Sequence, residues 1–244
     1  MPATTSTQPS RPGTLRAILP IASVVVVAGA AMVLRPWLID AAWPGTAAQR
    51  GSIAYHAALQ ASGLLLAALT LLVAYRLSRG RAATYWGLGI PSAPARPVRW
   101  LGVREGTSWR RLGVVMLVWI TLLLAGFLYL GLAHDIDRDL SPTILMVALA
   151  FAVTNAVAEE VIYRLSLVGV LRGVASDATI LALGAAIFGV AHIAGVPGGP
   201  VGVVMAVFLG WFLTKSIVET GGMFWAVLIH LVQDILIFAF VLHL

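Results

Sequence analysis

The sequence contains no cysteine and a single lysine, and only 11% of its 244 residues are charged. The absence of cysteine excludes disulfide bonds and thiolate-ligated metal sites. Soluble globular domains carry about 25% charged residues, so the low charge content argues against a soluble protein. With 60% hydrophobic residues and a mean hydropathy of +0.95, the composition instead indicates an integral membrane protein.

The few charges that are present are mostly arginines. Fifteen arginines and one lysine stand against ten acids and give a net charge of +6. In a soluble protein such a balance suggests nucleic-acid binding, but here the arginines cluster in connectors beside apolar stretches. That arrangement is typical of membrane topology. We therefore expect a lipid bilayer, and not nucleic acid, as the partner of this chain.

Apolar stretches that approach the length of about 20 residues needed to cross a bilayer recur along the chain. They predict an all-α fold, a polytopic transmembrane helical bundle with about seven spans. The first span contains Ala28-Gly29-Ala30, which resembles a signal-peptidase site, but its apolar run continues to Leu34 and favours an uncleaved helix. The predicted spans cover residues 17–34, 53–75, 112–133, 143–170, 178–194, 199–218 and 222–243.

The distribution of arginine predicts the orientation of these spans. The connector 76–111 holds eight arginines, opposed only by Glu105, whereas the connector before residue 143 holds three aspartates and one arginine. Basic connectors lie on the cytoplasmic side. We therefore expect a protein of the cell membrane with connector 76–111 and the N-terminus in the cytoplasm and the C-terminus outside.

The composition along the chain predicts a division into three segments. Residues 1–14 are rich in Ser, Thr and Pro and indicate a disordered tail. Residues 15–111 comprise two transmembrane helices and the basic connector, whose aromatic residues and arginines suit the membrane surface. Residues 112–244 form the predicted core, and we find no internal repeat.

Ionisable side chains interrupt the apolar pattern of three later spans. Each such residue costs about 2.5–3.5 kcal/mol at membrane depth, so it persists where it pairs or lines a wet cavity. The residues come in pairs that share a helix face at i,i+4 spacing, and Glu159 stands about 100° around the helix from Glu160. The pairs are Glu160 with Arg164, Phe188 with His192, and His230 with Asp234.

Each of these residues also has a structural interpretation. Glu160 and Arg164 suit a buried ion pair, a histidine suits an interhelical hydrogen bond, Asp234 suits a partner for a histidine, and Phe188 suits core packing. Because no solvent is available to satisfy these polar groups separately, we expect them to converge. The residues by themselves predict a buried polar site built from three helices.

The order of the three patterns resembles that of the CPBP family of intramembrane proteases. The patterns in this sequence are Glu159-Glu160-x-x-x-Arg164, Phe188-x-x-x-His192 and His230-x-x-x-Asp234. This family is also called Abi and includes CAAX prenyl proteases and bacteriocin-processing enzymes. The resemblance covers about residues 110–243. It implies an endopeptidase in which Glu159 and His192 activate a water, His230 and the residue four positions on form an oxyanion hole, and Arg164 orients the glutamates.

One position departs from the family pattern. The third motif ends most often in Asn, whereas this sequence has Asp234. An ionised aspartate cannot donate a hydrogen bond to an oxyanion. Either Asp234 is protonated, which burial favours, or it is ionised and orients His230.

Three further expectations complete the sequence interpretation. Two histidines and two acids could ligate zinc, with Glu159, His192 and His230 as the ligands, but the water mechanism does not require a metal.

The scarcity of lysine beside arginine is typical of high-GC bacteria and argues against a prenylated CAAX substrate. We therefore expect a membrane-associated protein or peptide as the substrate, with Phe188 contacting it. A non-proteolytic membrane scaffold of the same fold and a small transporter are the alternatives.

Overall fold

The computed structural model describes residues 14–42, 52–132 and 141–242. These residues form helices and connecting loops, and no strand element lies among them. The helices are α1 (Thr14–Ala42), α3 (Ile53–Leu77), α4 (Trp109–Leu132), α5 (Pro142–Glu160), α6 (Ser166–Leu171), α7 (Asp177–Ala191), α8 (Gly199–Thr220) and α9 (Phe224–Val241). A π-helical turn, Val161–Leu165, joins α5 to α6, so these two form one long rod.

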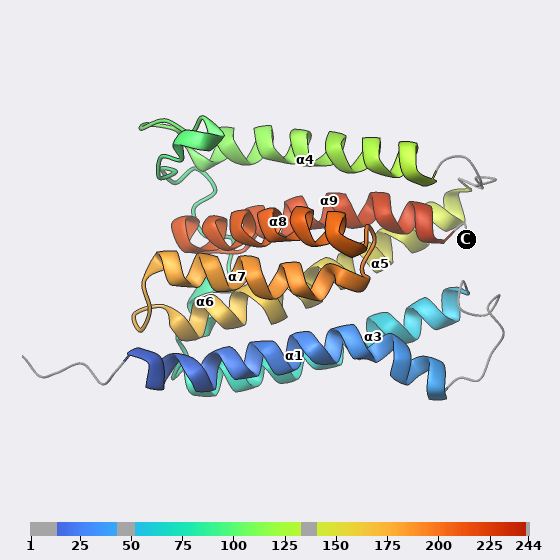
Figure 1. Ribbon diagram of the computed structural model, residues 1–244, viewed down its shortest axis with the longest axis horizontal. Helices are drawn as coiled ribbons and strands as arrows, with labels where there is room; N and C mark the ends of the chain where they lie inside the picture. The colour runs from blue at the N-terminus through green and yellow to red at the C-terminus, as the bar shows by residue number, and fades with distance from the viewer. Residues whose placement is uncertain (1–13, 43–51, 133–140, 243–244) are drawn as a thin grey trace, which may run out of the picture.

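The predicted all-α membrane bundle is confirmed. The rods lie side by side with their axes nearly parallel, and successive rods run in opposite directions (Figure 1). Within the described residues, four helical stretches are long and apolar enough to cross a membrane, namely 53–77, 109–130, 142–171 and 199–220, and 177–191 and 224–240 are shorter apolar helices. The predicted tail lies outside the described residues except for Thr14, where α1 begins, and α1 continues through the signal-peptidase-like site.

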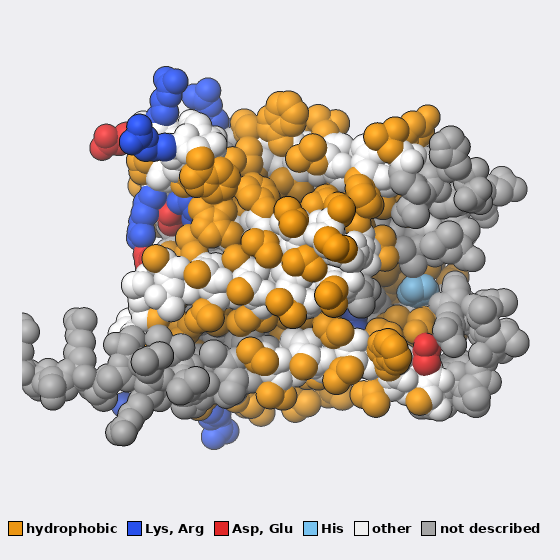
Figure 2. Space-filling model, in the orientation of Figure 1, with side chains coloured by type: hydrophobic (Ala, Val, Ile, Leu, Met, Phe, Trp, Pro, Cys, Tyr) orange, Lys and Arg blue, Asp and Glu red, His pale blue; other side chains and the backbone are white. Residues whose placement is uncertain are grey.

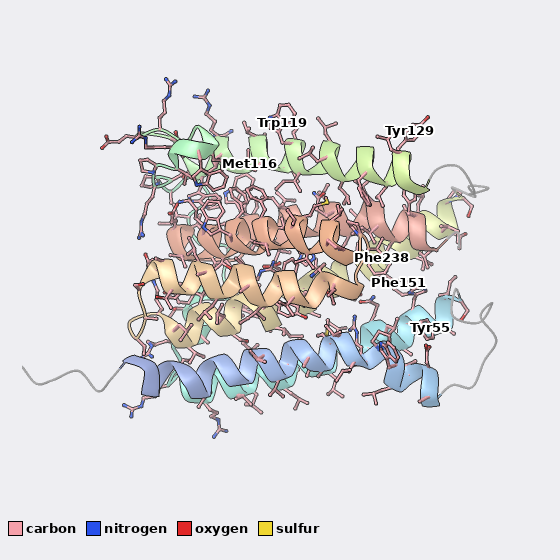
Figure 3. All side chains as sticks on the ribbon, viewed as in Figure 1. Tyr55, Met116, Trp119, Tyr129, Phe151 and Phe238 are labelled. Carbon is pink, nitrogen blue, oxygen red and sulfur yellow. The ribbon has the colours of Figure 1, made fainter. Side chains whose placement is uncertain are left out.

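Two close helix pairs build the centre of the bundle. Helices α7 and α8 touch through glycines: a Cβ on Gly210 would lie 2.6 Å from the carbonyl oxygen of Gly184. Close approach through small residues is how helices associate where lipid supplies no hydrophobic drive. Helices α5 and α9 form the second pair, in which the rings of Phe151 and Phe238 lie 5.9 Å apart (Figure 3). Helix α4 packs mainly on α9, so it stands at the edge of the bundle.

The connector between α3 and α4 is pinned to one end of the bundle by acids on α7 and α8. Glu219 Oε2 accepts hydrogen bonds from the indole of Trp109 at 2.8 Å and from the backbone N–H of Arg96 at 3.2 Å. Lys215 pairs with Glu219 and donates to the carbonyl oxygen of Arg96 at 3.2 Å. Arg96 also pairs with Asp177 at 2.6 Å. The connector is therefore a docked part of the fold.

Basic side chains gather at this end of the molecule, where α4 begins (Figure 2). We expect this end to face the cytoplasm, so a cysteine introduced at the exposed Ser92 should resist an impermeant maleimide in intact cells. Thr143→Cys, at the exposed start of α5 on the opposite end, should be labelled. The natural chain has no cysteine, so it gives no background. Labelling of Ser92→Cys before permeabilisation would reverse the orientation.

Candidate active site

The polar residues of the three patterns meet inside the bundle. They come from the end of α5, the end of α7 and the middle of α9. Glu159 and Glu160 close α5, and Arg164 lies in the π-helical turn that follows. Such turns occur frequently at functional sites. Phe188 and His192 lie at the end of α7, and the third pattern lies in the middle of α9. The expected convergence of the polar groups is thus observed.

Glu160 is the structural centre of the cluster. Its Oε1 accepts a hydrogen bond from Nη1 of Arg164 at 2.8 Å and lies 2.7 Å from Nδ1 of His230. The side chains of Glu160 and Arg164 are both 0% exposed. The predicted ion pair between them is confirmed, and it also ties α9 to α5 through His230.

Glu159 has a different environment from its neighbour. Its side chain is 14% exposed, against 0% for Glu160. The amide of Asn155 donates to its Oε1 at 3.3 Å, whereas Oε2 has no hydrogen-bond partner among the described residues. That oxygen lies 3.7 Å from Nε2 of His230. Oε2 of Glu160 likewise has no hydrogen-bond partner among the described residues, so the two glutamates differ in exposure, and Glu159 is the more accessible of the two to a water.

The ring of His192 is oriented by its own helix. Its Nδ1 lies 2.9 Å from the backbone carbonyl oxygen of Phe188. A carbonyl oxygen only accepts, so Nδ1 carries the proton, and in the neutral ring Nε2 is left as an acceptor. This tautomer is the one that a general base requires.

Phe188 contacts two polar residues of the site. Its ring centroid lies 4.1 Å from that of His192, and the guanidinium carbon of Arg164 lies 3.5 Å from the same centroid. The side chain is 0% exposed. Phe188 is thus packed in the centre of the site, and its contact with substrate stays a prediction.

His230 and Asp234 face each other across one turn of α9. Nε2 of His230 lies 3.6 Å from Oδ1 of Asp234, a separation similar to its distance from Glu159. Oδ2 of Asp234 accepts a hydrogen bond from Asn155 at 3.1 Å. The imidazole edge of His230 therefore points between two carboxyl groups.

A cavity of about 130 Å³ adjoins these groups. Phe188, His192, His230 and Asp234 line it together with apolar side chains of α4 and α8. A water occupies about 30 Å³ of liquid, so the cavity has room for several waters or part of a peptide. Leu123 on α4 belongs to its wall and is 65% exposed, which places the mouth toward the outer face of the bundle.

Residues 140–236 match the family model described as type II CAAX prenyl endopeptidase Rce1-like. The matched segment runs from the start of α5 into α9 and includes every residue of the three patterns. This segment, the Rce1-like domain, is similar to that family. Comparisons with curated proteins and with solved structures gave no match. At the level of the family, the match supports an intramembrane endopeptidase of the CAAX-protease type.

Helices α1 and α3 lie outside the Rce1-like domain, yet α1 brings a charge to it. Arg35 donates to the carbonyl oxygen of Leu59 at 2.9 Å and interacts electrostatically with Glu159. Gly63 makes the necessary room, because a Cβ there would lie 2.1 Å from a guanidinium nitrogen of Arg35. The sequence interpretation missed Arg35 because it directly follows the predicted first span and resembles a flanking basic residue.

Asn155 is the second residue near the site that the sequence did not reveal. Its amide nitrogen bridges Glu159 on its own helix and Asp234 on α9. The available signal was its position one turn before Glu159 within an apolar span, because a polar amide there needs a partner. Asn155 couples the carboxyl groups of two different patterns.

The Rce1-like domain, as the structure describes it, contains no group of side chains arranged to bind zinc. Among the residues that the structure describes, no three His, Asp or Glu side chains are grouped so that they could hold a metal ion. The chemistry proposed below therefore uses only side chains and water.

Proposed function

We propose that this protein is an intramembrane endopeptidase that hydrolyses a peptide bond of a membrane-associated protein or peptide. The observation that carries the proposal is Oε2 of Glu159, which has no hydrogen-bond partner among the described residues and lies 3.7 Å from Nε2 of His230, a residue that lines the cavity together with His192. A base, a donor and a partly apolar cavity are the parts that amide hydrolysis needs. The family match of the same segment supports the reaction class.

In the proposed reaction, a water lies between Glu159 and His192. Oε2 of Glu159 or Nε2 of His192 accepts a proton from this water while its oxygen attacks the carbonyl carbon of the peptide bond. The same proton then passes to the leaving amine nitrogen as the C–N bond breaks. General acid–base catalysis of this kind contributes about 10²–10⁴-fold to the rate.

His230 is the proposed donor to the oxyanion. Glu160 binds its Nδ1, so the ring is held with Nε2 directed toward the space beside Asp234 and Glu159. Because Nδ1 carries the proton that is donated to Glu160, an N–H at Nε2 requires the imidazolium form of His230, and in that form it stabilises the negative charge that develops on the carbonyl oxygen. Arg164 has no direct role in this scheme, and it fixes Glu160 and thereby the orientation of His230.

Asp234→Asn is expected to keep activity within about threefold of the parent. An asparagine retains an oxygen for the bond from Asn155 and presents an amide donor where the family pattern has one. Asp234→Leu, of similar shape but without polar atoms, is the matched control and should lose activity. The measurement is the rate of peptide cleavage by each purified variant together with its thermal unfolding.

A different result would identify the ionised form of Asp234 as the working state. In that case Asp234 holds His230 as a cation, and Asp234→Asn should cost about 10²–10³-fold, the range for losing one oxyanion donor. Unchanged unfolding of the variant would have to accompany this loss.

The wall of the cavity suggests the class of substrate. Apart from the site residues and Gln233, its lining comes from Ile, Leu, Val, Met, Ala, Phe, Pro and Gly residues of α4, α8, α9 and the turn after α7. Such a surface accommodates an apolar peptide segment. We propose an unprenylated membrane-associated protein or peptide as the substrate, in keeping with the bacterial character of the composition.

Quantitative proteomics of membranes tests this function directly. A strain that lacks the protein is compared with strains that carry the parent or Glu159→Gln at equal abundance. Substrates should accumulate as uncleaved precursors both in the deletion strain and in the Glu159→Gln strain. If Glu159→Gln restored the parental pattern, the protein would act as a scaffold and the protease proposal would be wrong.

A further inference from the structure

A second hollow, separate from the catalytic cavity, lies where the connector meets α4. Its volume is about 610 Å³, and it is formed by residues 101–108 and by the first turns of α4 as far as Met116. A neighbouring hollow of about 480 Å³ shares residues 102–105 with it and adds Arg99. Neither hollow includes a residue of the three catalytic patterns.

Two guanidinium groups line the larger hollow. Arg104 and Arg111 are exposed, and among the described residues neither side chain has an ion-pair or hydrogen-bond partner. Arg96 and Arg172, at the same end of the bundle, are both paired with Asp177. The free arginines therefore present unused fork-shaped donors, which match the geometry of a phosphate. Glu105, the one acid in the lining, binds neither of them.

The floor and continuation of the hollow are apolar. Val115 and Met116 form its inner wall. Val115, Val118 and Leu122 follow Arg111 at spacings of three or four residues, so all four lie along one face of α4. The three apolar side chains are 41%, 51% and 59% exposed. In Figure 3, Met116 lies at the connector end of α4 and Trp119 points away from the bundle. A charged head and an apolar track thus share one helix face.

We propose that this hollow binds the phosphate headgroup of an anionic phospholipid between Arg104 and Arg111, with an acyl chain along Val115, Val118 and Leu122. The two unpaired arginines, Arg104 and Arg111, account for the phosphate. The exposed apolar face below them accounts for a lipid, since a free phosphate would make no use of it. The site lies at the end of the bundle that carries the basic connector, where the headgroups of the bilayer are expected. This proposal is independent of the protease function.

The test uses the purified full chain in neutral detergent, titrated with phosphatidylglycerol or with phosphatidylcholine of the same chains, and native mass spectrometry counts the bound lipid. Arg104→Gln with Arg111→Gln should weaken phosphatidylglycerol binding by about 30-fold and leave the weaker phosphatidylcholine binding unchanged. The matched control, Arg76→Gln with Arg81→Gln, removes the same charge from exposed positions at the same end and should change binding by less than about threefold.

Three further arms decide the source of the phosphate and the place of the lipid. Inorganic phosphate should not displace phosphatidylglycerol, and displacement at equal concentration would show a small-anion site. Equal weakening by both double variants would show diffuse surface charge and overturn the proposal. Phosphatidylglycerol with a photoreactive acyl chain should label residues 115–122 of the parent protein, a measurement that does not depend on whether the variants fold. Labelling elsewhere would also overturn the proposal.

Discussion

Glu159→Gln is expected to reduce peptide cleavage by about 10²–10⁴-fold while the protein keeps its fold and abundance. The substitution removes the negative charge that would take a proton from the water and changes the shape of the side chain very little. The amide of Asn155 can still donate to the oxygen that remains, so the local packing is retained. Cleavage of an accumulated precursor by purified protein in detergent measures the loss.

Folding is checked by the thermal unfolding of the same preparation, which should match the parent. Glu159→Asp is a useful companion, because it keeps the charge but withdraws it by one methylene from the place where His192 and His230 converge. It should retain part of the activity. A Glu159→Gln variant with parental activity would exclude this residue as the base, whatever the stability of the protein.

Glu160→Gln is expected to act mainly on stability, with a loss of about 3–5 kcal/mol in the free energy of unfolding. Arg164 is 0% exposed, and Glu160 is the one carboxylate in a salt bridge with it among the described residues. Neutralising Glu160 therefore leaves a buried positive charge without its counter-charge. Nε and Nη2 of Arg164 already lack hydrogen-bond partners among these residues, so no second acceptor replaces the lost carboxylate. Unfolding in detergent, followed by tryptophan fluorescence, measures the effect.

A double variant separates the buried charge from other consequences of this change. Glu160→Gln combined with Arg164→Met removes both charges and should recover much of the lost stability, since replacing a whole buried pair costs less than breaking it. The double variant should remain inactive, because His230 has lost the carboxylate that holds its Nδ1. If Glu160→Gln unfolded like the parent and alone abolished cleavage, the roles of Glu159 and Glu160 would have to be exchanged.

The local part of the site was predictable from residue spacing. Two side chains four positions apart on a helix share a face, so the ion pair between Glu160 and Arg164 followed from the sequence. The same rule placed Phe188 next to His192, whose rings are 4.1 Å apart. The cost of polar groups in lipid predicted that the three patterns would meet, and they do.

Contacts between distant segments were not predictable in this way. Asn155 hydrogen-bonds both Glu159 and Asp234, and Arg35 on α1 acts electrostatically on Glu159. Neither interaction has a periodic signature, because each depends on how two helices are rotated and shifted against each other. The hydrogen bond from His230 to Glu160, where spacing alone suggested only Asp234 as its partner, has the same origin.

The sequence alone determined the environment and the class of fold, because the low charge content and the apolar runs leave only helices that satisfy their own backbone in lipid. It also determined which polar residues must find partners inside the bundle. The tertiary structure decided which partner each one has: Glu160 binds Arg164 and His230 through its Oε1, whereas the more exposed Glu159 accepts a hydrogen bond from Asn155. Adjacent residues receive different roles because a helix turns by about 100° per residue, and only the packing of the neighbouring helices distinguishes the two directions.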